Sequence, residues 1–290
     1  MNDAQPSPRH ALITGANTGI GLTTALGLAR QRIHLTLACR DMEKAARARD
    51  EIVAKVPHAE GHIELIQLDL SDITQVRTAA AAWLEKDAPL DLLINNAGLA
   101  GARGVTRDGF ELAFGVNHLG HFLWTLSLLP ALEKRPHPRI VNVASRAHYR
   151  APGIDFDAVQ RPTRSTTGFP EYQVSKLANV LFSAELDRRL SARDTDSPNI
   201  SCYSLHPGVV ATDVWRKVPA PLRAVMKWFM ISSEDGAKTT LYCATDPACA
   251  AESGGYYDEC AQKEPSALAQ DAALAATLWA RSSEWTEIDL

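Results

Sequence analysis

Short apolar runs of β-forming residues alternate along the chain with longer segments in which apolar residues recur at helical spacing. The first run, 11–13, ends at a glycine-rich turn, and the apolar positions Leu22, Ala25, Leu26 and Ala29 after it are spaced as in an amphipathic helix. Further strands are expected at 33–38, 63–68, 92–94, 139–143 and 200–205, and further helices at 42–56, 73–84, 110–132 and 172–190. This alternation predicts a doubly wound α/β fold, in which helices cover both faces of a parallel sheet.

Two segments interrupt the alternation. Residues 148–170 are rich in Pro, Gly, Ser, Thr and Arg, which predicts a loop of the length that usually lies beside a binding site. Residues 214–230 are apolar and aromatic with interspersed Arg and Lys, which predicts a small lid over an apolar substrate; a packed surface helix and a membrane-interface helix are the alternatives. We expect a polar tail at 1–9 and a single domain at 10–290.

Charge and cysteine content exclude several classes of protein. The 290 residues include 30 Lys and Arg against 34 Asp and Glu, and this net charge of −4 argues against a nucleic-acid partner. The five cysteines are scattered without a C-x-x-C pair, so we expect neither disulfides nor a metal site, and a reducing compartment fits. No stretch reaches about 18 uninterrupted apolar residues, which predicts no transmembrane segment and a cytoplasmic location.

The turn after the first strand has the composition of a phosphate-binding site. Gly15, Gly19 and Gly21 follow the strand in G-x-x-x-G-x-G spacing and lead into the first helix. Glycines let backbone N–H groups approach a ligand closely, and a helix N-terminus carries partial positive charge, so the two together suit a nucleotide phosphate. A strand-to-helix loop without a ligand is the alternative interpretation.

Tyr172 and Lys176 are placed for proton transfer. A spacing of four residues puts both side chains on one face of the predicted helix. A neighbouring ammonium favours the phenolate and lowers a phenol pKa that is ordinarily about 10, so the pair can exchange a proton with a carbonyl or alcohol oxygen. Ser145 follows the end of the strand at 139–143 and can hydrogen-bond that oxygen, although a capping or turn serine is the commoner role at such a position.

Asn117 is a polar residue inside an otherwise apolar predicted helix. A buried amide is unfavourable there unless specific partners satisfy it. A water or a helix kink that connects the amide to Lys176 would explain the position, and a satisfied core asparagine is the competing explanation.

Taken together, these motifs resemble the short-chain dehydrogenase/reductase family over essentially the whole chain, from Ala11 to about Trp279. They occur in the family's order: Thr14-Gly15-x-x-x-Gly19-x-Gly21, Asn95-Asn96-Ala97-Gly98, Asn117, Ser145, Tyr172-x-x-x-Lys176 and His206-Pro207-Gly208. Finer features, such as VNHLGHF at 116–122 and LHPGVVATD at 205–213, resemble the retinol dehydrogenase and WW-domain oxidoreductase branch. The resemblance implies a Rossmann-type fold.

The resemblance also implies roles for individual residues. Tyr172 would be the acid and base, Lys176 would lower its pKa and hold the nicotinamide ribose, Ser145 would orient the substrate carbonyl, and Asn117 would support a proton relay. Ser145, His148 and Trp215 would contact the substrate. The cofactor would lie against Gly15, Asn17, Thr18, Gly19, Ile20, Gly21, Arg40, Asp69, Leu70, Asn95, Ala97, Gly98, Tyr172, Lys176, Pro207, Gly208, Val209 and Thr212.

The end of the second predicted strand bears on the choice of cofactor. Relatives that prefer NAD tend to have an acidic residue there to bind the ribose 2′-OH, whereas this strand ends in Ala38-Cys39-Arg40, and an arginine can clamp a 2′-phosphate. The expected cofactor is therefore NADP(H); Asp41 follows directly, which leaves NAD as the alternative.

These expectations amount to a hydride transfer between NADP(H) and an apolar carbonyl or alcohol. A catalytically weak, dinucleotide-sensing binding protein is the alternative, although such relatives usually lack the Tyr or the Lys that this chain retains. The resemblance further implies a homodimer or homotetramer formed through the helices at 110–132 and 172–190.

Overall fold

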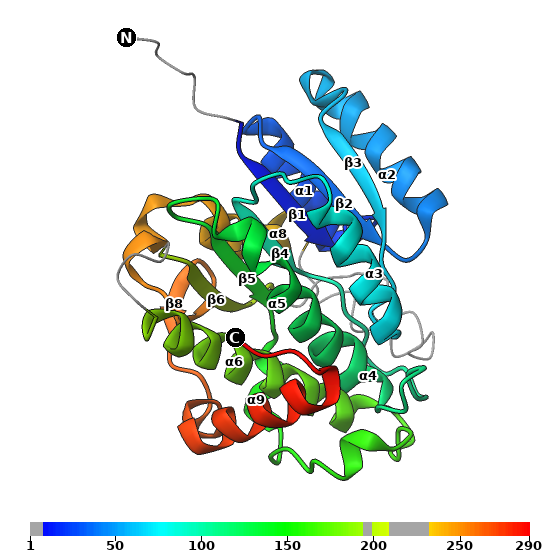
Figure 1. The fold of residues 1–290 in the computed structure, drawn as a ribbon, viewed down its shortest axis with the longest axis vertical. Coiled ribbons are helices and arrows are strands. Elements are labelled where there is room, and N and C mark those ends of the chain that lie inside the picture. Colours follow the sequence, from blue (N-terminus) through cyan, green and yellow to red (C-terminus); the bar gives the residue numbers. More distant parts are fainter. Residues whose placement is uncertain (1–7, 194–198, 209–231) are drawn as a thin grey trace.

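The structure is a computed structural model that describes residues 8–193, 199–208 and 232–290. Its strands form one eight-stranded sheet in the order β3-β2-β1-β4-β5-β6-β7-β8, in which every neighbouring pair is parallel except β7 and β8 (Figure 1). The strands are β1 (His10–Thr14), β2 (His34–Cys39), β3 (Ile63–Gln67), β4 (Leu92–Asn95), β5 (Arg139–Val143), β6 (Ser201–His206), β7 (Tyr256–Asp258) and β8 (Ala261–Lys263).

Helices cover both faces of this sheet. One core layer joins the sheet to α1, α2 and α8, and a second joins its other face to α3, α5 and α6, with α9 packed outside α6 (Figure 1). The doubly wound α/β prediction is confirmed. The helices are α1 (Gly19–Arg30), α2 (Met42–Lys55), α3 (Ile73–Leu84), α4 (Leu112–Phe114), α5 (Gly120–Leu132), α6 (Phe169–Ser191), α8 (Ser233–Thr245) and α9 (Ala272–Thr286).

Local sequence accounts for where most of these helices begin. The side chains of Asp41, Asp72, Ser232 and Asp271 accept hydrogen bonds from backbone N–H groups in the first turns of α2, α3, α8 and α9. Thr18, at the start of α1, makes no such bond. The N-terminus of α1 therefore keeps its N–H groups free of a side-chain cap.

The predicted helix at 110–132 is interrupted in the structure. It consists of α4, a π-helical turn at Gly115–Leu119, and α5. Gly115 begins the turn and Gly120 follows it, and neither position has room for a side chain: a Cβ would lie 2.3 Å from a methyl of Thr106 at the first and 2.6 Å from the Leu70 carbonyl oxygen at the second. The π-helical turn places Asn117 at an irregularity in the backbone.

Other features extend the sequence-based picture. Helix α6 begins at Phe169, three residues before the predicted start, because Gly168 adopts φ +65° and Pro170 occupies its first turn. Strands β7 and β8 and helices α8 and α9 were not predicted.

Helix α9 covers part of the helices that were expected to mediate oligomerisation. The ring of Trp279 in α9 packs edge-on against that of Phe122 in α5, with 5.0 Å between the ring centroids. Oligomerisation through these helices stays a prediction. The described helices include none that is both long and apolar enough to cross a bilayer.

Candidate active site

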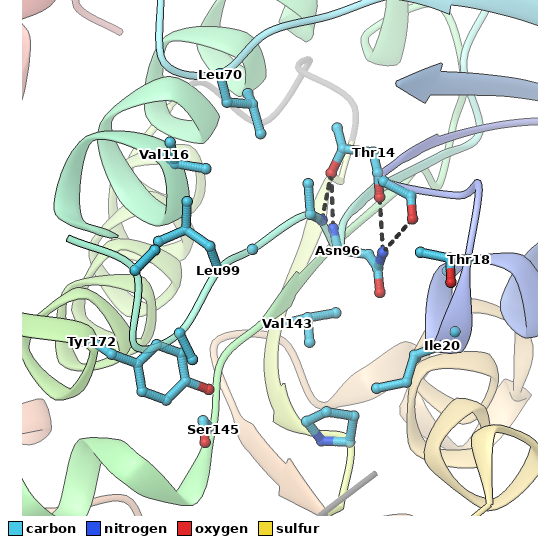
Figure 2. A pocket seen from close by; sticks show the side chains of 18 of the residues that line it. Thr14, Thr18, Ile20, Leu70, Asn96, Leu99, Val116, Val143, Ser145 and Tyr172 are labelled. Carbon is cyan, nitrogen blue, oxygen red and sulfur yellow. Dashed lines mark hydrogen bonds between the residues drawn. The ribbon is translucent and has the colours of Figure 1, made fainter. Parts of the chain in front are cut away.

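A cavity of about 1090 Å³ lies at the carboxyl ends of the central strands, where ligands bind in open α/β sheets. Figure 2 shows Thr14, Thr18 and Asn96 on one side of it and Tyr172 and Ser145 on another, with Val143 between them. The cavity thus joins the glycine-rich turn to the proposed proton-transfer residues.

The glycine-rich turn is folded tightly against the strand next to it. Gly15 has φ +66°, and a Cβ there would lie 2.9 Å from Ala97 Cα. A Cβ on Gly21 would lie 2.4 Å from the Gly15 carbonyl oxygen and 2.5 Å from Asn96 Nδ2. Only glycine fits either position, and the uncapped N-terminus of α1 opens onto the cavity beside them. These features suit the diphosphate of a dinucleotide.

Thr14 and Asn96 hold the turn in place. The Thr14 hydroxyl oxygen accepts hydrogen bonds from the N–H groups of Asn96 at 3.0 Å and Ala97 at 2.9 Å, and Asn96 Nδ2 donates to the carbonyls of Thr14 at 2.9 Å and Gly15 at 3.3 Å (Figure 2). Four bonds therefore join the ends of β1 and β4. Asn96 is the second residue of the Asn95-Asn96 pair, and the sequence analysis had not named it as a site residue.

Tyr172, Ser145 and Lys176 converge at the opposite side. Tyr172 and Lys176 lie one turn apart in α6, are only 8% and 4% exposed, and both line the cavity with Ser145. Lys176 Nζ donates to the Val143 carbonyl at 2.7 Å and lies 5.7 Å from the centre of the Tyr172 ring. The phenol hydroxyl points towards Ser145 (Figure 2).

Burial sets the pKa values of this pair. It raises the pKa of the Tyr172 phenol, while a hydrogen bond with Ser145 acts in the opposite direction. Burial also lowers the pKa of Lys176 to about 7, because an ammonium loses its hydration inside the protein. The expectation that Lys176 lowers the phenol pKa differs from this structure, in which desolvation is the largest influence on both groups.

We expect Lys176 in the cofactor-free protein to titrate near neutrality. The direct measurement is the Cε chemical shift of ¹³C-lysine against pH, assigned with Lys176→Met, and it should report a pKa of about 7. In the unfolded chain this lysine has its ordinary pKa of about 10.4, so between pH 7 and 10.4 the unfolded state binds more protons than the folded state. The contribution of Lys176 to the free energy of unfolding should therefore rise with pH over this range. Titration of Lys176 at the ordinary lysine pKa would contradict this assignment.

Asn117 is fully buried, and its side chain makes three hydrogen bonds. Its Oδ1 accepts from the Leu99 N–H at 2.9 Å, and its Nδ2 donates to the Leu99 carbonyl at 3.0 Å and to Ser175 Oγ at 2.9 Å. A Cβ on Gly98 would lie 3.3 Å from Asn117 Oδ1 and 3.6 Å from Lys176 Nζ, so the amide and the ammonium both lie beside Gly98. Asn117 does not itself line the cavity but fixes the loop and helix that do.

Two other predicted site residues lie beneath the cavity. Asn95 points into the sheet face covered by α5, where its Nδ2 donates to Thr125 Oγ1 and Asn142 Oδ1, both at 2.8 Å. His148 is fully buried; its Nδ1 donates to the Ser145 carbonyl at 2.7 Å and its Nε2 accepts from the Ser266 N–H at 3.2 Å. Neither lines the cavity. Val209, Thr212, Trp215 and the lid segment 214–230 lie outside the described residues.

The remaining predicted residues do line the cavity. The far end from Tyr172 is formed by side chains after β2 and β3, with Arg40, Asp69 and Leu70 among them. Asp69 Oδ1 accepts from the backbone N–H of Ser71 at 3.0 Å and from its hydroxyl at 2.7 Å, which fixes that loop. The other predicted cofactor-binding residues that line the cavity are Asn17, Thr18, Gly19, Ile20, Ala97, Gly98, Pro207 and Gly208.

Comparison with known proteins decides the family. The sequence model described as short chain dehydrogenase matches residues 9–157. Human retinol dehydrogenase 13 is 40% identical over 281 residues, covering 94% of this chain and 82% of its own, and mouse retinol dehydrogenase 12 is 39% identical over 276 residues, covering 94% and 84%. The chain is a short-chain dehydrogenase.

A solved structure agrees with this assignment. The crystal structure of an uncharacterised protein from Mycobacterium Paratuberculosis is 34% identical, with a TM-score of 0.76 and coverage of 97% of this chain and 94% of that one. The relatives confirm that this short-chain dehydrogenase is an oxidoreductase of the retinol dehydrogenase branch. The family uses a nicotinamide dinucleotide, and the cavity, the glycine-rich turn and the uncapped helix N-terminus fit one.

The structure adds lining residues to this dehydrogenase that the sequence analysis missed. Arg146 and Arg150 project from the helical turn after Ser145, and Lys44 and Arg47 project from α2 beside Arg40. The spacing of Lys44 and Arg47, about one helical turn apart, could have indicated that both face the cavity. The apolar lining residues missed include Leu99, Ala100, Ala102, Leu112, Val116 and Phe169.

Proposed function

We propose that this short-chain dehydrogenase transfers a hydride between NADP(H) and an apolar carbonyl or alcohol, with Tyr172 as the acid and base. The convergence of Tyr172, Ser145 and Lys176 on one cavity that also opens onto the glycine-rich turn is the observation behind this proposal. The bound dinucleotide supplies the hydride. The chain's own residues bind the reactants, orient them and move the proton.

The proton is handled by Tyr172. A protonated phenol within hydrogen-bond reach of the substrate oxygen donates its proton when a carbonyl is reduced, and the phenolate accepts one when an alcohol is oxidised. The Ser145 hydroxyl, beside the phenol, is placed to hold the same oxygen. Lys176, when charged, favours the phenolate through its electrostatic field, and its position one helical turn away also suits the nicotinamide ribose.

The α2 end of the cavity supports a preference for NADP(H). Asp41, the carboxylate that favours NAD, already accepts from the Lys44 N–H at 3.0 Å and pairs with Lys44 Nζ at 3.2 Å, as the cap of α2. Arg40 lines the cavity and has no ion pair among the described residues. A free guanidinium next to an occupied carboxylate suits a ribose 2′-phosphate better than a 2′-OH.

We expect Arg40→Ala to reduce the preference for NADPH over NADH by about 10- to 100-fold, the range for loss of a charge-assisted hydrogen bond. The measurement is kcat/KM for each cofactor at a fixed substrate concentration. Arg49→Ala is the control, because Arg49 lies on α2, the helix that begins just after Arg40, pairs with Asp50 at 2.8 Å and does not line the cavity. An unchanged ratio in Arg40→Ala would exclude this residue as the determinant.

The wall near Tyr172 supports an apolar substrate. Leu99 and Val116 lie on the same side of the cavity as Tyr172 (Figure 2), and Leu112 and Phe169 also line it. Burying the apolar surface of a ligand against these side chains is favourable by about 25 cal/mol per Å² removed from water. The test is NADPH oxidation by purified protein with a panel of apolar aldehydes and ketones and a matched panel of polar ones. Tight NADPH binding without turnover on either panel would instead favour the dinucleotide-sensing alternative.

A further inference from the structure

His121 connects the two halves of the site although it does not touch the cavity. It lies in the first turn of α5, is 2% exposed, and bonds at both ring nitrogens. Its Nε2 lies 2.9 Å from Thr14 Oγ1, in the strand that leads into the glycine-rich turn, and its Nδ1 lies 3.0 Å from the Asn117 carbonyl oxygen. The function proposed above gives this residue no role.

The hydrogen-bond partners of the two ring nitrogens determine which of them carries the proton. A hydroxyl has one proton and two lone pairs, and both lone pairs of Thr14 Oγ1 are used by the N–H groups of Asn96 and Ala97. Its proton must therefore go to His121 Nε2. At the other end, a carbonyl can only accept, so Nδ1 must hold a proton. The Asn117 end requires a proton on Nδ1 and the Thr14 end excludes one on Nε2, so the ring is the neutral Nδ1–H tautomer.

The chain of bonds continues from His121 to the catalytic helix. Asn117 Nδ2 donates to Ser175 Oγ at 2.9 Å, and Ser175 Oγ donates to the Tyr172 carbonyl at 2.8 Å. The bonds form two runs that meet at Asn117, one from Thr14 through His121 to its backbone carbonyl and one from its side-chain amide through Ser175 to the Tyr172 carbonyl. Bonds within each run strengthen one another in a dry interior. Thr14, Asn117 and Ser175 are each at most 1% exposed, so water does not compete.

We propose that His121 is a positioning residue with two contacts. Through Thr14 it fixes the cofactor-binding turn, and through the Asn117 carbonyl it fixes Asn117, whose side chain is hydrogen-bonded by way of Ser175 to the backbone of Tyr172. This role rests on the proposed function. The two ring nitrogens serve different ends of the site. Loss of the Nε2 contact should therefore weaken cofactor binding, and loss of the Nδ1 contact should slow turnover.

Two substitutions separate these contacts. In His121→Asn the amide reaches the position of Nδ1 but not that of Nε2, and in His121→Gln it reaches the position of Nε2 but not that of Nδ1. We expect His121→Gln to lower kcat about tenfold at saturating NADPH with a Kd for NADPH within about twofold of the original. For His121→Asn we expect the reverse order, with the Kd raised about tenfold and kcat lowered less than about threefold.

His118 provides matched controls. It is 1% exposed, lies almost one turn before His121, and pairs through Nε2 with Ser282 Oγ of α9 at 2.9 Å, away from the cavity. The variants His118→Asn and His118→Gln should lower the melting temperature without separating kcat from Kd. A general effect of removing a buried imidazole from this region would appear in both pairs.

The tautomer gives a readout that does not depend on turnover. ¹⁵N-histidine NMR of the full-length protein, with His121 assigned from the variants, should show the proton on Nδ1 at neutral pH. A proton on Nε2, or equal losses of kcat and NADPH affinity in both His121 variants, would overturn the proposal. An inactive original protein would contradict the proposed function alone, because the tautomer and the NADPH Kd values would still decide the role of His121.

Discussion

We expect Tyr172→Phe to lower kcat for NADPH-dependent carbonyl reduction by about 10³-fold, the middle of the range for general acid catalysis. The substitution removes only the phenol oxygen, which lies beside Ser145 in the cavity, and keeps the buried ring that packs 5.8 Å from Phe169. The fold should therefore be retained. The measurement is kcat with whichever aldehyde or ketone of the panel the original protein reduces fastest.

Tyr149→Phe is the control for this substitution. Tyr149 is 47% exposed, donates its hydroxyl to the Glu264 carbonyl at 2.5 Å, and does not line the cavity. Its kcat should stay within about twofold, since substitutions at exposed positions are usually nearly neutral. If Tyr172→Phe kept a kcat close to that of Tyr149→Phe, the proton would have to come from another group.

Gly21→Ala should weaken NADPH binding by about 100-fold or more. The added Cβ would meet the Gly15 carbonyl oxygen at 2.4 Å and Asn96 Nδ2 at 2.5 Å, so the turn would have to move away from the strand that holds it. Misplaced N–H groups cannot bind a phosphate, and charge-assisted bonds of this kind are each worth about 1.5–3 kcal/mol. Fluorescence titration with NADPH measures the Kd directly.

Gly27→Ala tests whether this effect is local. Gly27 lies in the same helix, and its Cβ would meet only the end of the Leu241 side chain of α8, at 2.6 Å, which can move. This variant should change the melting temperature by a few degrees at most and leave the NADPH Kd within about twofold. Equal Kd values for the two alanine variants would place the dinucleotide elsewhere.

The sequence predicted the strands and helices that build the site because their hydrophobic periodicity is strong. β1 with its glycine-rich turn, β5 with Ser145 after it, and α6 with Tyr172 and Lys176 were all expected where they occur. Strands β7 and β8 were missed because three residues are too few to show a period. β7 forms because it pairs with β6, and β8 forms because it pairs with β7.

Side-chain direction was harder to predict than position. Asn95 and Asn96 follow one another, so they point to opposite sides, as side chains alternate along a strand. Asn95 shares the sheet face of Leu93, which α5 covers, whereas Asn96 closes the glycine-rich turn. Applying the alternation to β4 would have separated their roles.

His148 and His121 required tertiary information. His148 is fixed by the N–H of Ser266, 118 residues away, which no local pattern reveals. His121 shares a helical face with Asn117, four residues before it, and this spacing was the available signal. The raised phenol pKa of Tyr172 also could not be anticipated, because the depth of burial depends on the whole fold.

We propose that this chain moves a hydride from a nicotinamide to a carbonyl carbon inside the cavity between Gly15 and Tyr172. The direct measurement uses NADPH in which deuterium replaces both hydrogens at C4 of the nicotinamide, an apolar aldehyde or ketone that the protein reduces, and mass spectrometry of the product. We expect deuterium on the carbinol carbon with the original protein, and its formation slowed about 10³-fold in Tyr172→Phe. A product alcohol without deuterium, or no product with any apolar carbonyl, would contradict the proposed hydride transfer.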